Sequence, residues 1–199
     1  MRWHWTIITV VALAAAGCAG NRPEPGTAGG GGTAGSDEEV VTGAYSVPPL
    51  NATMLRGASY PTSVGNGGFV QLFQGTARQS GAGGDNEISL LGDPAFGDLD
   101  GDGENDAAVI LVTKTPIGNV YYELIAVLNQ DGYPDAVAGM LLGDRIRINV
   151  VGVLAGKIYV TLVRHGPNDP LESPTLRAKE SYQLQGRELV RVLQAGLGG

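Results

Sequence analysis

Between residues 45 and 199 the apolar residues recur at every second position, and turn-forming residues separate the runs. No stretch keeps the 3.6-residue period of an amphipathic helix for more than about two turns. Alternation of this kind is typical of strands that bury one face, whereas residues 107–113 are apolar throughout and predict a central strand. The sequence therefore predicts a mainly β fold with little helix: an antiparallel sandwich, a roll or a strongly curved sheet of about nine strands.

The positions of the strands follow from these runs and from the turns between them. A hairpin is expected around Gln74-Gly75, and a second turn is expected at residues 130–132. In the segment 145–151 the even-numbered residues, Ile146, Ile148 and Val150, should share the buried face. The expected strands are residues 69–73, 76–79, 87–91, 107–113, 120–128, 136–142, 145–151, 157–164, 175–184 and 188–193.

The charge balance limits the classes of partner. The chain carries 13 basic and 20 acidic residues, which gives a net charge of −7 at pH 7. Such an excess of acid disfavours non-specific binding to nucleic acid and docking on anionic lipid headgroups. The single cysteine, Cys18, excludes an intramolecular disulfide and a thiolate metal site. No nucleotide-binding loop or catalytic motif is evident, so we expect a protein that is not an enzyme and does not bind nucleic acid.

The first eighteen residues predict export and lipidation. Arg2 precedes a largely apolar run, residues 3–16, which is interrupted only by His4 and two threonines. This run is shorter than the roughly 20 residues of a membrane-spanning helix, and it is typical of a secretory signal peptide. Small residues then precede Cys18, a pattern that resembles the lipobox of bacterial lipoproteins, in which the cysteine is acylated. The alternative is an ordinary signal peptide cut after Ala-x-Ala, with Cys18 incidental.

The lipobox resemblance divides the chain into three parts. Residues 1–17 would be a lipoprotein signal peptide, residues 18–44 the lipidated cysteine with a flexible Gly-rich linker, and residues 45–199 a single β-rich domain. Gly, Pro, Ser, Thr and acidic residues dominate the linker, and no apolar period is present. Ala19 follows the cysteine, and the resemblance to sorting rules in bacteria with two membranes implies the outer membrane, with the domain facing the periplasm.

The sharpest local motif is the acidic segment 98–106. Alternate side chains of a tight loop point inward, and clustered carboxylates repel one another unless a cation lies among them. Gly103 permits the sharp turn, and calcium accepts an irregular all-oxygen shell better than magnesium does. The bidentate Glu of an EF-hand is missing, because Val109 occupies its position. We expect a single Ca²⁺ site, or alternatively a solvated acidic turn; the candidate ligands are Asp98, Asp100, Asp102, Glu104 and Asp106.

With Phe96-Gly97 before it and a strand after it, this segment resembles the calcium loops of FG-GAP and VCBS-type repeats over roughly residues 96–112. The resemblance implies calcium binding but no seven-bladed propeller, since only one intact loop is present. The pattern of residues 50–195 further resembles a group of bacterial envelope proteins to which no activity is assigned. The features that carry this second resemblance are residues 97–103, 126–132, 142–145 and 165–170.

Two further segments each have a functional and a structural interpretation. Residues 127–135 repeat part of the acidic motif and keep Asp131, but Val127 stands at the first position and cannot bind a cation. This segment is either a hairpin turn or a second ion site. His165, which begins a His-Gly-Pro-Asn-Asp-Pro stretch, is either a general base oriented by Asp169 or part of a loop of turn-forming residues.

The sequence as a whole predicts a lipid-anchored, non-enzymatic domain of the cell envelope with one structural calcium ion. Its expected partners are the membrane, through the lipid anchor, and an unidentified envelope protein or glycan. The alternatives are a calcium-dependent binding or adhesion module and a hydrolase centred on His165. An exposed apolar patch beside residues 98–106 would favour the binding module, and a deep pocket around His165 would favour the hydrolase.

Overall fold

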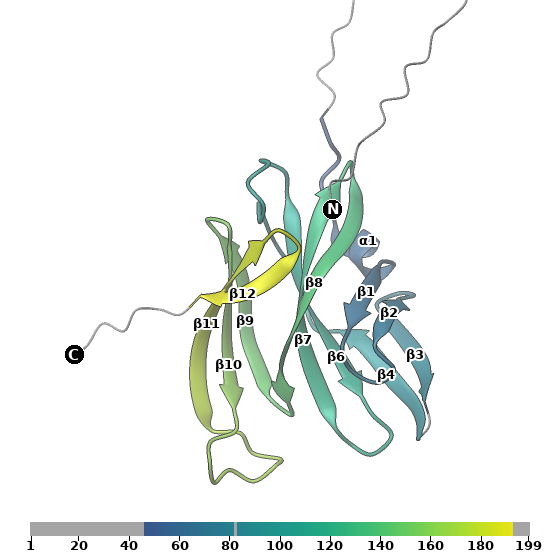
Figure 1. Ribbon diagram of the computed structural model, residues 1–199, viewed down its shortest axis with the longest axis vertical. Helices are drawn as coiled ribbons and strands as arrows, with labels where there is room; N and C mark the ends of the chain where they lie inside the picture. The colour runs from purple at the N-terminus through teal and green to yellow at the C-terminus, as the bar shows by residue number, and fades with distance from the viewer. Residues whose placement is uncertain (1–45, 82, 193–199) are drawn as a thin grey trace, which may run out of the picture. The chain divides into compact units, whose positions relative to one another are not determined.

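Antiparallel strands dominate the computed structural model, which describes residues 46–81 and 83–192 (Figure 1). This confirms the prediction of a mainly β fold with little helix. No helix in these ranges is long and apolar enough to cross a bilayer. The predicted signal peptide, linker and Cys18 lie outside the described residues. The elements are α1 (Ala52–Arg56), β1 (Ser59–Thr62), β2 (Gly68–Gln71), β3 (Thr76–Gly81), β4 (Gly84–Leu90), β5 (Ala95–Gly97), β6 (Asp106–Lys114), β7 (Val120–Gln130), β8 (Tyr133–Asp144), β9 (Arg147–Leu154), β10 (Lys157–Arg164), β11 (Leu176–Gln185) and β12 (Glu188–Val192).

The strands form sheets of six, four and two strands. The four-stranded sheet has the order β12-β11-β10-β9, and β1 pairs with β2. In the six-stranded sheet the order is β3-β4-β6-β7-β8, and β5 also pairs with β6. β4 pairs with residues 111–114 of β6, and β5 pairs with residues 106–108. Two short strands thus share one edge of β6, and the acidic segment is the connection from β5 back into β6.

Alternate residues of β6 belong to two hydrophobic cores. The first core lies between the six-stranded and four-stranded sheets and receives the even-numbered residues 108, 110 and 112. The second core lies on the opposite face, against α1 and the β1–β2 hairpin, and receives residues 107, 109 and 111. Both faces of β6 are therefore buried, which explains its uninterrupted apolar sequence. Burial of each large aliphatic side chain contributes about 1.5–3 kcal/mol.

The turn at Gln74-Gly75 is present, but the strands on either side of it diverge. Gln74 and Gly75 have φ angles of 52° and 83°, and Phe73 and Thr76 exchange N–H···O bonds of 2.8 and 3.1 Å across the turn. β2 then pairs with β1, and β3 pairs with β4, so the predicted hairpin between the two strands is wrong. The reason is that β1, which was not predicted, gives β2 a partner on the second core.

β9 carries a bulge that breaks the predicted alternation. Its pairing with β10 joins Ile148 to Leu162 and Val150 to Thr161, so Asn149 is one residue in excess. An extra residue of this kind reverses the faces of the strand beyond it. Val150 is consequently 59% exposed, and the prediction that it shares the buried face with Ile148 is wrong.

Candidate metal centre

Strand pairing fixes the two ends of the acidic segment, and a buried side chain near its first residue anchors it to the core. Gly97 at the end of β5 pairs with Asp106 at the start of β6, so residues 98–105 close a short loop. Leu99, the one apolar residue of this loop, is 4% exposed and belongs to the first core. Gly97 has no room for a side chain, since a Cβ there would lie 2.7 Å from Cγ1 of Val153. These contacts fix the loop against β9 and the sheet.

Aspartate side chains curl the loop by accepting its own backbone N–H groups. Asp98 accepts from Gly101 at 2.6 Å through Oδ1 and from Gly103 at 3.1 Å through Oδ2. Asp100 and Asp102 each accept the N–H two residues further along, at 3.2 and 2.8 Å. Gly101 and Gly103 have φ angles of 91° and 87°, which few residues other than glycine adopt readily. The curled backbone of the loop therefore requires glycine at positions 101 and 103.

Asp106 is fully buried and joins the loop to two strands. Its Oδ2 accepts the N–H of Leu99 at 2.7 Å, and its Oδ1 accepts the N–H of Asn129 in β7 at 2.9 Å. Burial raises the pKa of the Asp106 carboxyl, the two N–H donors oppose this shift, and the negative charges of Asp100 and Asp102 add to it. A carboxylate in this position would be stabilised by a nearby cation.

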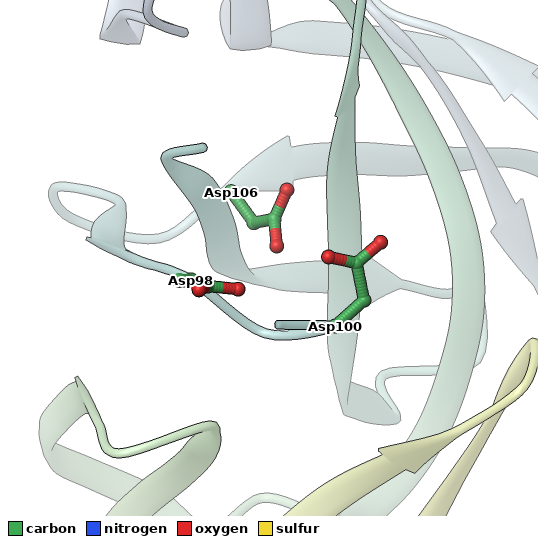
Figure 2. A group of neighbouring side chains, drawn as sticks. All are labelled: Asp98, Asp100 and Asp106. Atoms are coloured by element: carbon green, nitrogen blue, oxygen red, sulfur yellow. The ribbon is translucent and has the colours of Figure 1, made fainter. Parts of the chain in front are cut away.

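Three of the five predicted ligands converge. One carboxylate oxygen from each of Asp98, Asp100 and Asp106 lies within 4.8 Å of the other two, and Figure 2 shows the three side chains turned toward a common space. Calcium binds oxygen at 2.3–2.6 Å, so two of its ligands on opposite sides lie about 4.6–5.2 Å apart. The separation of the three oxygens therefore fits one shell around a single ion.

Asp102 and Glu104 lie outside this group of three. Loss of hydration raises the pKa of Glu104, and repulsion from Asp102 and Asp131 raises it further. Asp131 belongs to the β7–β8 turn, so a second acidic segment contributes to the negative potential of the loop. Asn129 and Asp131 are thus part of the surroundings of the site. No local pattern in the sequence predicted that they would lie beside residues 98–106.

The second copy of the acidic motif forms the turn between β7 and β8. Asp131 and Gly132 have φ angles of 53° and 88°, and Asn129 Oδ1 accepts the N–H of Gly132 at 2.9 Å. Val127, at the first position of the copy, is fully buried in the second core. This geometry agrees with the interpretation of the segment as a hairpin turn.

Asp169 closes the loop that follows β10. Its carboxylate accepts the N–H groups of Gly166 at 2.9 Å and Thr175 at 2.7 Å, and also the Thr175 hydroxyl. These donors, that of Gly166 foremost, hold the pKa of Asp169 below its usual range. Neither ring nitrogen of His165 has a hydrogen-bond partner among the described residues, Asp169 included, so Asp169 does not orient this imidazole.

Comparisons of the chain with protein-family models, with curated proteins and with solved structures find no match.

Proposed function

We propose that this chain is a lipid-anchored, non-enzymatic domain of the bacterial cell envelope whose acidic loop binds one structural calcium ion. The observation that carries the proposal is the convergence of Asp98, Asp100 and Asp106 within 4.8 Å. The loop leads directly into β6, which is paired on both edges and buried on both faces. An ion at this point would therefore act on the centre of the fold.

Calcium suits this loop better than magnesium does. Each of the three aspartates already accepts a backbone N–H, so the remaining lone pairs offer an irregular set of oxygen ligands. Magnesium demands near-ideal octahedral geometry, whereas calcium accepts six to eight oxygens in flexible arrangements. Calcium modules outside the cytoplasm need bind only at about 10⁻⁴–10⁻³ M.

Isothermal titration of the full-length protein with calcium or magnesium chloride tests the site directly. One calcium site with a dissociation constant of about 10⁻⁴–10⁻³ M is expected, with weaker binding of magnesium. Asp100 is exposed, so Asp100→Asn should preserve the fold and weaken calcium binding by at least about tenfold, the loss typical of perturbing even an outer partner of a ligand.

Asp131→Asn is the matched control, because it removes the same charge from the neighbouring turn, outside the group of three aspartates. It should leave calcium binding within about twofold, as a screened, exposed charge does. Absence of calcium binding at millimolar concentration, or an equal loss in both variants, would show that the loop is only an acidic turn.

The lipid anchor is tested by Cys18→Ala in cells. The variant should move from the membrane fraction to the soluble fraction and lose incorporation of labelled fatty acid, because the cysteine is the predicted site of acylation. Thr27→Ala, in the predicted linker, is the control and should stay with the membrane. Unchanged membrane association of the Cys18→Ala protein would refute the anchor.

A calcium-dependent binding or adhesion module is the second candidate, and one observation favours it. An open hollow of about 490 Å³ lies beside the acidic loop, between Asp98 and Gly101 on one side and residues 153–156, the end of β9 and the β9–β10 turn, on the other. Leu154 in this hollow is 70% exposed. An exposed apolar side chain next to the ion site could contact an envelope protein or glycan. Cross-linking in envelope membranes with calcium or with chelator distinguishes this role from a structural one.

A further inference from the structure

The four-stranded sheet has one face on the first core and the other toward solvent (Figure 1). In β10, Ile158, Val160 and Leu162 face the core, so the alternate residues face outward. Directly paired residues of antiparallel strands lie on the same face. The register of β10 with its neighbours therefore gives the outward residues of three strands: Arg147, Val150, Gly152 and Leu154 of β9, Lys157, Tyr159, Thr161 and Val163 of β10, and Arg177, Lys179, Ser181 and Gln183 of β11. Of these, Val163 and Ser181 are buried by their neighbours.

Positive charge gathers on this surface. Arg147, Lys157, Arg177 and Lys179, which we call the basic face, all lie on it. The outward residues of these three strands include no carboxylate, and the fourth strand, β12, brings Glu188 to the same face through its pairing with Gln185. Five other arginines of the described ranges form ion pairs, whereas none of these four pairs with a described acidic residue. Arg147 and Arg177 both pair with Val163, and Lys179 pairs with Thr161, so these three cations lie near one end of β10, whereas Lys157 lies at the other end.

The side chains around these cations are mixed: Val150 and Val163 are apolar, whereas others can form hydrogen bonds. Thr161 and Asn149 line an open hollow of about 290 Å³ together with Arg177, Ala178 and Lys179. Tyr159 lies outward on the central strand of the three and is 39% exposed. Arginine and lysine bind carboxylate and sulfate oxygens, and an exposed tyrosine ring offers a flat, amphipathic surface to a sugar ring. The open shape suits an extended chain better than a small enclosed molecule.

We propose that the basic face binds an acidic polysaccharide, a linear glycan that carries carboxylate or sulfate groups along its length. Charge complementarity supports the anionic ligand, and the mixture of cations, amide, hydroxyl and tyrosine side chains supports a hydrated sugar chain. Duplex DNA carries one charge per roughly 1.7 Å and would be repelled more strongly by the acidic remainder of the protein. The exposed Val150 and Leu154 are the feature that a lipid bilayer would use instead, so the test includes vesicles.

Biolayer interferometry of the full-length protein on immobilised polygalacturonate and heparin tests the proposal, with chelator present throughout. Both anionic polymers should bind and neutral dextran should not, and the affinity should fall as ionic strength rises. The double variant Arg177→Gln/Lys179→Gln should weaken binding by about tenfold. The matched control, Arg78→Gln/Lys114→Gln on the six-stranded sheet, removes the same charge and should change it by less than about twofold.

Tyr159→Ala separates sugar recognition from simple charge attraction. It should weaken binding to the polysaccharides by about fivefold while leaving binding to a short anionic peptide unchanged, because only the sugar ring contacts the tyrosine face. Unchanged melting temperatures would show that the variants are folded. Failure of both polymers to bind, an equal loss in the control pair, or tighter binding to phosphatidylglycerol vesicles or duplex DNA would overturn the proposal. Because chelator is present, none of these outcomes depends on calcium binding at the acidic loop.

Discussion

Calcium at about 10 mM, which is 100 times a dissociation constant of about 10⁻⁴ M, should raise the melting temperature of the full-length protein by about 5–10 °C above that of the chelated protein. A ligand that binds only the folded state at 100 times its dissociation constant stabilises by about 2.7 kcal/mol. For a domain of this size each kcal/mol corresponds to roughly 2–4 °C. The gain is expected to be global, because the loop between Asp98 and Asp106 leads into the central strand β6. Differential scanning calorimetry in calcium and in chelator measures the shift.

Two variants identify the origin of this shift. Asp100→Asn should reduce the calcium-dependent rise to about half or less, as a loss of at least about tenfold in affinity requires. In chelator it should melt at or slightly above the parent temperature, because one of the mutually repelling charges is gone. Asp131→Asn should keep most of the rise, since Asp131 lies outside the group of three aspartates. If calcium leaves the melting temperature of the parent protein unchanged, the ion has no structural role.

Local alternation was sufficient to predict most of the strands, because each of them buries one face or, for β6, both. The elements that were missed are short and depend on distant partners. β5 has three residues and exists only through its pairing with β6, and β1 has four residues with Pro61 among them. α1 is five residues long and is capped by Asn51, whose side chain accepts the N–H of Met54. None of these segments is long enough to show a period in the sequence.

The bulge in β9 shows a second limit of the pattern. The sequence from Arg145 to Val150 alternates without interruption, yet Asn149 is in excess over the partner strand and Val150 turns outward. The position of the bulge depends on how β9 and β10 align over their whole length. β10 itself begins and ends where the sequence predicted. The outward face that carries Arg177 and Lys179 follows from this register and from no local motif.

The acidic segment was recognisable because its carboxylates are close in sequence. Which of them converge is a property of the curl, in which Asp98 holds the N–H groups of Gly101 and Gly103. The three-dimensional structure was therefore needed to select Asp98, Asp100 and Asp106 from the five candidate ligands. The bond from Asn129 to Asp106 crosses from β7 to β6, and nothing in the sequence near either residue indicates it.

Replacement of Asp106 by alanine should lower the free energy of unfolding by about 2–6 kcal/mol in chelator, because two buried N–H groups each lose an acceptor at a cost of about 1–3 kcal/mol. These are the N–H groups of Leu99 and Asn129. The loss should occur without calcium, since it concerns the protein's own hydrogen bonds. Urea unfolding should show a lower midpoint with an unchanged slope. Amide hydrogen exchange should show reduced protection at Leu99 and Asn129 in particular.

Asp100→Ala is the control that separates this bridging role from the charge of the cluster. Asp100 is exposed, and its side chain accepts only an exposed N–H within the loop, so its loss in chelator should cost less than about 1 kcal/mol. Asp106→Asn should fall between the two, because its amide can accept one N–H but presents a donor to the other. Equal stability of Asp106→Ala and the parent in chelator, with the Asn129 amide still protected, would mean that Asp106 does not join the loop to β7. In that case the loop would be held by Leu99 and the pairing of Gly97 with residue 106 alone.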